Sequence, residues 1–362
     1  MNTEEILNDM SMTLQWSENT RETYSITLRQ YAKYHNLDLQ QLLDEADEEE
    51  DKRIRMKHRQ IKTRLLSFQQ YMAGKYEQST TNKKMALVKH MYSFYEIELP
   101  RIIPIKVIKT ETIKDIPTAE HIRTAILSTP NKKSKAIIAL MASSGMGRSE
   151  ILHLTLQDFI DATQDYTSQT ELVPILNELS TKSVVPTFNI HRIKTGMPYY
   201  TFCTPEATQL IIDYILERMF REDLTLDKQL IDISKYGFVK MFSRINDKQG
   251  WGYKNKRRFF RSHSMRKFFA TTLTKARVDF IYIEFLLGHS INSTTAAYYK
   301  VDPESLKKRY MTFMDKLTFL GDIKYDTIQS QEKQELELLR AKTKEQEERI
   351  NAIEQILQQR HI

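Results

Sequence analysis

Apolar residues recur at helical spacing through the first hundred positions of the chain. They return every three or four residues from Lys52 to Gly74 and again from Lys83 to Tyr95, as on one face of an amphipathic helix. Another helix is predicted to begin near Ser17, and the acidic run 44–51 is expected to be a solvated helix end or loop. Residues 1–108 are therefore predicted to form a compact unit of about four helices.

The next part of the chain combines helical patterns with one strand pattern. Helical spacing predicts three helices there, over residues 118–127, 134–143 and 205–218. From Pro186 to Phe202, β-branched and aromatic residues flank a turn at Lys194–Gly196, which predicts an antiparallel hairpin. We expect a second domain over residues 118–322. The fold class predicted for the whole chain is mainly α (α+β), with a small antiparallel sheet.

Two further segments differ from these domains in their pattern. Residues 99–117 hold three of the nine prolines, so this stretch is predicted to be extended and exposed, with the linker itself at 109–117. Residues 329–358 show a heptad pattern with charges of both signs between the apolar positions. The tail, 323–362, is therefore predicted to contain a short coiled-coil helix. A single helix packed on its own domain is the alternative.

Composition supports a helical protein and excludes several classes. The 362 residues include 9 glycines and 9 prolines, fewer than is usual, so tight turns are expected to be rare. Cys203 is the single cysteine, which excludes an intrachain disulfide and favours a reducing, cytoplasmic compartment. The longest apolar run, 136–142, is far shorter than a membrane span requires, and the acidic N-terminus shows no signal-peptide pattern.

Positive charge is concentrated in one place. The net charge is +7, yet seven cations and no acid fall within the fourteen residues 254–267, with Phe259 and Phe260 among them. Basic clusters with aromatic residues favour contact with a nucleic-acid backbone, and a solvated helix face is the alternative. We expect a nucleoid-associated protein whose DNA-binding residues include Lys254, Lys256, Arg257, Arg258, Arg261 and Lys267.

Five motifs follow one another in the second domain. They are the segment 144–154 with its arginine and glutamate, the hairpin with its lysine, an H-x-x-R at 263–266, the L-L-G-H at 286–289, and a tyrosine nine residues after that histidine. This order resembles the tyrosine recombinase (phage-type integrase) family over about 117–310. The sequences of the hairpin and of 294–310 are most similar to those of archaeal integrases. One departure is that Gly147 stands where the family usually has its first arginine, so Arg148 comes one residue late.

The resemblance implies a site-specific DNA recombinase or integrase, which cuts and rejoins strands through a 3′-phosphotyrosyl intermediate. Guanidinium groups suit a phosphodiester because they bind its oxygens with forked hydrogen bonds. The predicted catalytic residues are Arg148, Lys194, His263, Arg266, His289 and the nucleophile Tyr298, with Glu150 in support. Lys194 would protonate the leaving 5′-oxygen. Tyr299 and Arg192 remain the alternatives to Tyr298 and Lys194.

The resemblance also implies partners. Residues 1–108 resemble the family's helical core-binding domain, so the two domains are expected to hold double-stranded DNA between them as a homo-tetramer at the recombination site. Residues 303–319 could pass to a neighbouring protomer, and the tail could strengthen that contact. Neither a metal, nor ATP, nor another cofactor is expected, because the phosphotyrosyl bond conserves the energy of the strand. A type IB topoisomerase-like enzyme and a catalytically silent DNA-binding or architectural protein are the alternatives.

Overall fold

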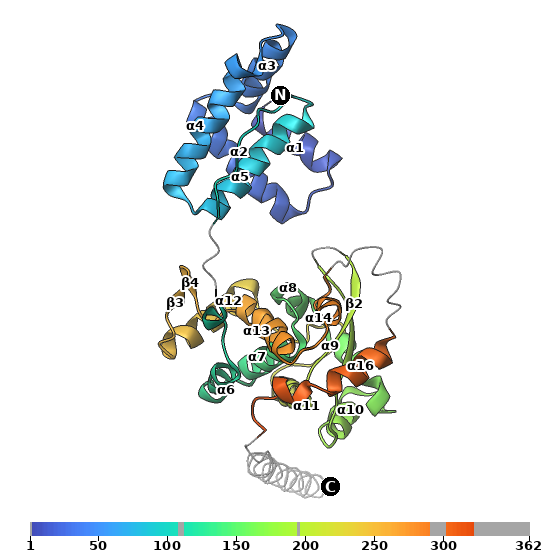
Figure 1. Ribbon diagram of the computed structural model, residues 1–362. Helices are drawn as coiled ribbons and strands as arrows, with labels where there is room; N and C mark the ends of the chain where they lie inside the picture. Colours follow the sequence, from blue (N-terminus) through green and yellow to red (C-terminus); the bar gives the residue numbers. More distant parts are fainter. Residues whose placement is uncertain (1, 108–111, 194–195, 290–301, 322–362) are drawn as a thin grey trace, which may run out of the picture. The chain divides into compact units, whose positions relative to one another are not determined.

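The chain divides into two compact units, Met1–Thr110 and Glu111–Ile362, each with its own apolar core (Figure 1). The computed structural model describes residues 2–107, 112–193, 196–289 and 302–321. Helices account for most of this described part, and its named strands pair into two antiparallel two-stranded sheets in the second unit. The predicted fold class is confirmed. The predicted coiled-coil tail lies outside the described residues.

Within its described residues, 2–107, the first unit contains five α-helices rather than about four. They are α1 (Thr3–Thr13), α2 (Glu18–His35), α3 (Leu39–Asp51), α4 (Gln60–Lys75) and α5 (Gln78–Phe94), with a 3-10 turn η1 (Met56–His58) before α4. The Ser17 hydroxyl caps α2 by accepting a hydrogen bond from the backbone N–H of Thr20, as predicted. The sequence pattern missed α1 and began α4 too early. The segment before α4 is not α-helical apart from the turn η1, and Arg59 turns back there to donate to the carbonyl of Ile54 and the carboxylate of Glu50.

The start of the stretch predicted to be extended and exposed is fastened to the first unit. Pro100 and Ile102 are buried, and the Lys89 Nζ donates to the carbonyl oxygen of Ile102 at 3.2 Å. The side chain of Asn82 brackets Ile105, accepting from its N–H at 2.9 Å and donating to its carbonyl at 2.8 Å. The expectation of exposure is therefore wrong at Pro100 and Ile102, because Ile102 joins the core of the unit, whereas Ile103 is 75% exposed.

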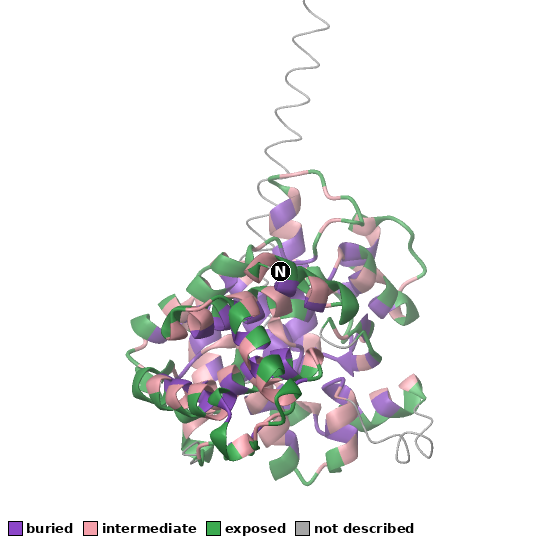
Figure 2. Cartoon of the chain, turned by 90° about the horizontal axis from the view of Figure 1, so that it is seen from above, coloured by how far each residue is buried: buried purple, intermediate pink, exposed green. Residues whose placement is uncertain are grey.

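The second unit is organised around one helix. Its α-helices are α6 (Ala119–Ser128), α7 (Lys132–Ser144), α8 (Arg148–His153), α9 (Leu156–Thr163), α10 (Leu172–Leu179), α11 (Pro205–Met219), α12 (Lys235–Lys248), α13 (Ser262–Lys275), α14 (Phe280–Leu286) and α16 (Pro303–Met311); 3-10 turns are η2 (Ile113–Asp115), η3 (Gln164–Tyr166) and η4 (Met314–Leu317). Helix α7 is buried from Ala136 to Ser144 and contacts α6, α11 and α13. Across the chain, buried residues lie among the packed helices and exposed residues on their outer sides (Figure 2).

The predicted hairpin is present as β1 (Thr187–His191) and β2 (Pro198–Phe202), which pair from Thr187 with Phe202 to His191 with Pro198. Strand β2 lies against α7 and α14. A second hairpin, β3 (Tyr253–Lys254) and β4 (Arg257–Arg258), was not predicted from the sequence. Its tip, Asn255 and Lys256, takes positive φ values of 48° and 60°, the conformation of a tight two-residue hairpin turn.

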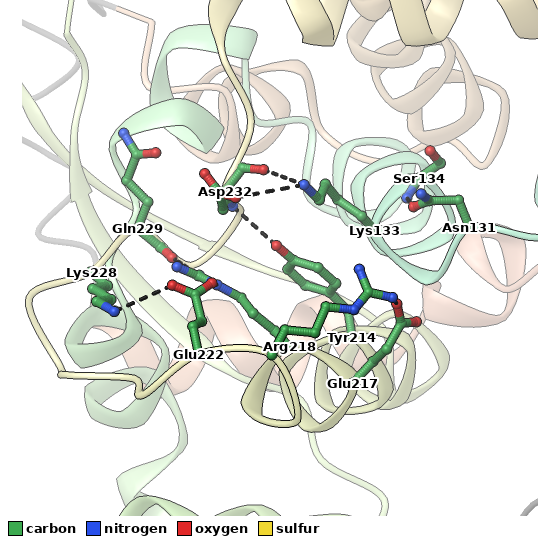
Figure 3. Close-up of polar contacts among 11 residues, drawn as sticks. Asn131, Lys133, Ser134, Tyr214, Glu217, Arg218, Glu222, Lys228, Gln229 and Asp232 are labelled. Carbon is green, nitrogen blue, oxygen red and sulfur yellow. Dashed lines mark hydrogen bonds and ion pairs between the residues drawn. The ribbon is translucent and has the colours of Figure 1, made fainter.

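A polar cluster holds the connection between α11 and α12 (Figure 3). Arg218 is buried and donates to the Glu222 carboxylate and to the carbonyl oxygen of Gln229. The backbone N–H of Asp232 donates to the Tyr214 hydroxyl at 3.2 Å, and Lys133 in the first turn of α7 donates to the Asp232 carbonyl. These contacts fasten the long connection to α7 and α11. Protein groups provide both sides of each of these hydrogen bonds.

Residues 303–320 belong to the core of their own unit. Tyr310 in α16 is fully buried, and its hydroxyl donates to the carbonyl oxygen of Ser143 at 2.8 Å. The buried carboxylate of Glu206 accepts from the backbone N–H groups of Phe319 at 3.0 Å and Leu320 at 2.7 Å. In the isolated chain these residues fill the core of their own unit, and their passage to a neighbouring protomer stays a prediction. No described helix is long and apolar enough to span a bilayer.

Removal of the Tyr310 side chain should destabilise the second unit. The midpoint of its urea unfolding should not depend on protein concentration. We expect Tyr310→Ala to lower its free energy of unfolding by about 3–5 kcal/mol, and Tyr310→Phe by about 1 kcal/mol through loss of the hydrogen bond to Ser143. The matched control is Tyr236→Ala, because Tyr236 is 73% exposed. Urea unfolding followed by Trp251 fluorescence in a Trp16→Phe background measures this, and a concentration-dependent midpoint would indicate exchange of α16 between protomers.

Candidate active site

Three distant segments meet at the guanidinium group of Arg266. This residue lies in the second turn of α13, whose start is fixed by Ser264 and the backbone of Arg261, which exchange hydrogen bonds of 2.9 and 2.6 Å. Arg266 Nη1 donates to the carbonyl oxygen of Gly145 at 2.7 Å. Nη2 donates to the carbonyl oxygen of Leu287 and lies 3.0 Å from His289 Nε2. Burial lowers the pKa of Arg266, which indicates a cation in a largely dehydrated place.

His289 is held between Arg266 and a carboxylate. Its Nδ1 lies 2.8 Å from Glu284 Oε2, so a proton on Nδ1 is donated to Glu284 and the lone pair of Nε2 accepts from Arg266. Burial lowers the pKa of His289, and the charges of Arg266 and Arg192 lower it further against the opposing effect of Glu284. His289 is therefore neutral at pH 7, with its tautomer set by Glu284.

Tyr199 of β2 forms the floor beneath this turn. Its ring packs so close to Gly288 that a Cβ at that glycine would lie 2.6 Å from the ring, and Gly288 has a φ of +60°. The Tyr199 hydroxyl is buried with no hydrogen-bond partner among the residues that the structure describes. Burial, followed by the negative charge of Glu150, raises the pKa of Tyr199, so the phenol stays protonated.

Arg192, directly after β1, reaches the same turn. Its Nη1 donates to the carbonyl oxygens of Leu287 and Gly288, both at 2.9 Å, across nearly a hundred residues of sequence. Its Nε is buried and has no acceptor within the described part of the chain. The sequence suggested Arg192 only as a substitute for Lys194, and the bonds to the turn were not predicted. Lys194 itself lies outside the described residues.

Arg148 and Glu150 are placed differently from one another. Arg148 is the first residue of α8, is half-buried, and makes no hydrogen bond or ion pair with any residue described by the structure. Glu150 is 9% exposed. A Cβ atom added at Gly147 would lie only 2.3 Å from Glu150 Oε2. The glycine at the position of the family's first arginine thus gives space to the Glu150 carboxylate.

The remaining predicted residues divide between the site and the surface. His263 is exposed in the first turn of α13, three residues before Arg266 and so on the same side of the helix. Tyr298, the predicted nucleophile, and its alternative Tyr299 lie outside the described residues. The structure therefore brings Arg266, His289 and Glu150 together with Tyr199 and Glu284, which sequence analysis did not assign, and with Arg192, which it named only as the alternative to Lys194.

The basic cluster is less uniform than its sequence suggests. Lys254, Lys256 and Arg257 are exposed on the β3–β4 hairpin, and Lys267 is half-buried on α13. Arg258 and Arg261 contact their own unit: Arg258 pairs through two nitrogens with the carboxylate of Asp247 at 3.0 and 3.1 Å, and Arg261 donates to the carbonyl oxygen of Arg258 at 2.8 Å. The acid that neutralises Arg258 comes from α12, outside the acid-free stretch of sequence.

Comparison with known proteins identifies the fold that carries this site. The model of the phage integrase family matches residues 108–305. None of the curated proteins compared with the chain matches it.

The described residues contain no group of three or more histidine, cysteine or acidic residues that could hold a metal ion.

Solved structures of recombinases share the fold at low sequence identity. A XerH site-specific recombinase bound to a palindromic difH substrate is 16% identical, with a TM-score of 0.53 over 84% of this chain and 82% of that chain. The Tn1549 transposon integrase in complex with transposon right end DNA is 14% identical, with a TM-score of 0.52 over 86% and 99%. A lambda integrase dimer bound to a core site is 13% identical, with a TM-score of 0.52 over 83% and 96%.

The neutral state of His289 can be measured directly. We expect its imidazole to titrate below its ordinary pKa of about 6.5 in an NMR titration. Glu284→Gln should move the midpoint further down, because the carboxylate favours the protonated ring. Glu304→Gln, which removes an exposed carboxylate paired with Lys308, serves as the control and should change nothing. A midpoint above the ordinary value, or an upward shift in Glu284→Gln, would contradict this geometry.

Two glycines separate the effect of backbone strain from that of crowding. Gly250 has a φ of +65° with nothing within 4 Å of an added Cβ, whereas a Cβ at Gly288 meets the Tyr199 ring. We expect Gly250→Ala to lower the free energy of unfolding by about 1 kcal/mol, and Gly288→Ala to lower it by about 1–3 kcal/mol more. Urea unfolding of both variants tests this, and equal losses would show that Tyr199 does not confine the turn.

Proposed function

The chain belongs to the phage integrase family, and it is a site-specific tyrosine recombinase, which cuts and rejoins DNA strands; we propose how its own residues perform that reaction. The observation that supports the assignment of roles is the convergence of Arg266, His289 and Glu284 at the end of α14. A buried guanidinium whose neighbours are fixed can bind a phosphodiester without reorganising, which stabilises the charge that grows in the transition state.

Tyr298 is the proposed nucleophile. Its phenolic oxygen attacks the scissile phosphorus, the bond from phosphorus to the 5′-oxygen breaks, and a 3′-phosphotyrosyl bond forms. The phenol proton passes to a base, and Lys194 gives a proton to the leaving 5′-oxygen, so the strand ends in a free 5′-hydroxyl group. Attack by a 5′-hydroxyl of a partner strand reverses these steps. The phosphotyrosyl bond conserves the energy of the strand, so neither ATP nor a metal ion is required.

Arg266 binds the non-bridging oxygens of the scissile phosphate in this proposal. Three of its donor hydrogens are directed at Gly145, Leu287 and His289, and these bonds fix the plane of the guanidinium. His289 accepts from Arg266 and is therefore a positioning residue, with Glu284 fixing its tautomer. His263, exposed on the same side of α13, contributes a hydrogen bond to the phosphate. Glu150 supports the site through its negative charge beside Tyr199.

DNA is the partner, and the phosphates of its backbone are the groups that the exposed cations are proposed to bind. Lys254, Lys256, Arg257 and Lys267 are proposed to contact phosphates, whereas Arg258 is already paired with Asp247. We propose that residues 1–108 form a core-binding domain and that 118–322 form the catalytic domain, with 109–117 between them. Exchange of strands between two duplexes requires four nucleophiles, so a tetramer on DNA is proposed. The heptad pattern of 329–358 makes the tail the candidate for protomer contact.

Trapping of the covalent intermediate tests the function and the nucleophile together. We expect wild-type protein to form an SDS-resistant adduct with members of a pool of nicked duplexes whose central base pairs are randomised, because the nick lets the 5′-hydroxyl fragment diffuse away. Tyr298→Phe should abolish the adduct, since it removes the attacking oxygen, and Tyr299→Phe should retain it. Electrophoresis of the labelled strand measures the adduct.

The other outcomes distinguish the alternatives. The absence of an adduct from every duplex would favour a silent DNA-binding protein and contradict the proposal. Loss of the adduct in Tyr299→Phe alone would move the nucleophile by one residue. An enzyme that relaxes supercoiled DNA on any sequence, but joins no strand to a partner duplex, would behave as a type IB topoisomerase.

A further inference from the structure

We propose that Arg192 supplies the second guanidinium group that binds the scissile phosphate in this recombinase, in place of Arg148. The inference rests on the proposed function, because it concerns the same phosphate. It assigns a catalytic role to a residue at the end of β1 that the order of sequence motifs does not identify. It also joins the phosphate site to the hairpin that carries Lys194.

The geometry brings Arg192 and Arg266 to one oxygen atom. Arg192 Nη1 and Arg266 Nη2 both donate to the carbonyl oxygen of Leu287. The second bond of Arg192, to the carbonyl oxygen of Gly288, places its guanidinium directly before His289. Two guanidinium groups that share an acceptor lie close enough to bind the same tetrahedral anion, whose non-bridging oxygens accept several hydrogen bonds at once.

The charges of the site agree with this placement. The positive charge of Arg192 lowers the pKa values of Arg266, His289 and Tyr199. Two cations held side by side repel each other, and an anion bound to both removes that repulsion. Glu150 acts on Arg266 through its charge, but no described carboxylate lies within hydrogen-bond distance of either guanidinium, so a phosphodiester would supply the direct anionic partner.

Arg192 also has donors available. Its Nε is buried without an acceptor in the described part of the chain, whereas Arg266 already directs three hydrogens at protein atoms. An unpaired buried donor costs free energy, and such groups in folded proteins are commonly explained by a ligand or a catalytic role. A small rotation of the Arg192 side chain, which keeps the Leu287 bond, would turn Nε and Nη2 toward a phosphate oxygen.

Position 147 cannot supply this group in the observed structure. The Glu150 carboxylate lies 2.3 Å from where a Cβ at Gly147 would be, so any side chain there requires Glu150 to move. Arg148, the next residue, begins α8 without a hydrogen bond to any described residue that would fix its guanidinium. Fixed donors stabilise a transition state more than mobile ones do. Arg192 is fixed by two bonds and Arg148 by none that the described residues provide.

The first test compares arginine-to-lysine variants on a duplex that wild-type protein cleaves. We expect Arg192→Lys to slow formation of the covalent adduct about 10²–10³-fold, as for loss of one preorganised donor, and Arg148→Lys to slow it less than about tenfold. Lysine keeps the charge but loses the fork of donors. Arg221→Lys is the matched control, because Arg221 is exposed and pairs with Glu217. Affinity for the duplex should change little in all three variants.

The second test uses a readout that a structural role would not move. A methylphosphonate at the scissile position replaces one charged oxygen by a methyl group, so the linkage is neutral and needs less cationic stabilisation. We expect the loss of cleavage in Arg192→Ala, relative to wild type, to be at least tenfold smaller on the methylphosphonate than on the phosphate. A variant that merely unfolds the hairpin would lose cleavage equally on both linkages, which would overturn the inference.

The role of Arg192 can be overturned while the proposed function stands. Equal cleavage by Arg192→Lys and wild type, or a larger loss in Arg148→Lys, would overturn the role of Arg192 while the adduct formed by wild-type protein upholds the proposed function. If wild-type protein forms no adduct with any duplex, both the proposed function and this inference fall together.

Discussion

The carbonyl oxygen of Leu287 is the point on which the site depends. It lies at the carboxyl end of α14, where the carbonyl groups of a helix carry partial negative charge and lack partners within the helix. Arg266 and Arg192 both donate to it, from α13 and from the end of β1. This shared acceptor, together with the carbonyl oxygens of Gly145 and Gly288, holds two like charges side by side in a largely dehydrated place.

The rest of the second unit holds this oxygen in position. Gly288 takes a conformation with positive φ and leaves room for the Tyr199 ring. Contact with this ring of β2 therefore fixes the position of the turn. The central helix α7 ends at Gly145, whose carbonyl accepts from Arg266. Tyr310 ties α16 to the same end of α7 through Ser143. The carboxyl end of α7 therefore takes part both in the packing of the core and in the geometry of the site.

Local pattern was sufficient where a residue's role is set by its neighbours in sequence. The hairpin 187–202 and the start of α2 at Ser17 were predicted because alternation and capping act over a few residues. The bonds of Arg192 were not, since Leu287 is 95 residues away and nothing in the hairpin sequence names its acceptor. Asp247 likewise neutralises Arg258 from another helix. The isoleucines after Pro100 were misread because their partners lie earlier, in α5.

Charge balance explains why such a site should be incomplete as protein alone. Glu284 acts through the imidazole of His289, and Glu150 lies close enough to raise the pKa of Tyr199 rather than to pair with a guanidinium at hydrogen-bond distance. The carbonyl oxygens of Gly145, Leu287 and Gly288 offer only partial charges to Arg266 and Arg192. Dipoles orient the two cations without neutralising them. An anion that enters therefore gains the full attraction of both, and a phosphodiester that becomes more negative in the transition state gains the most.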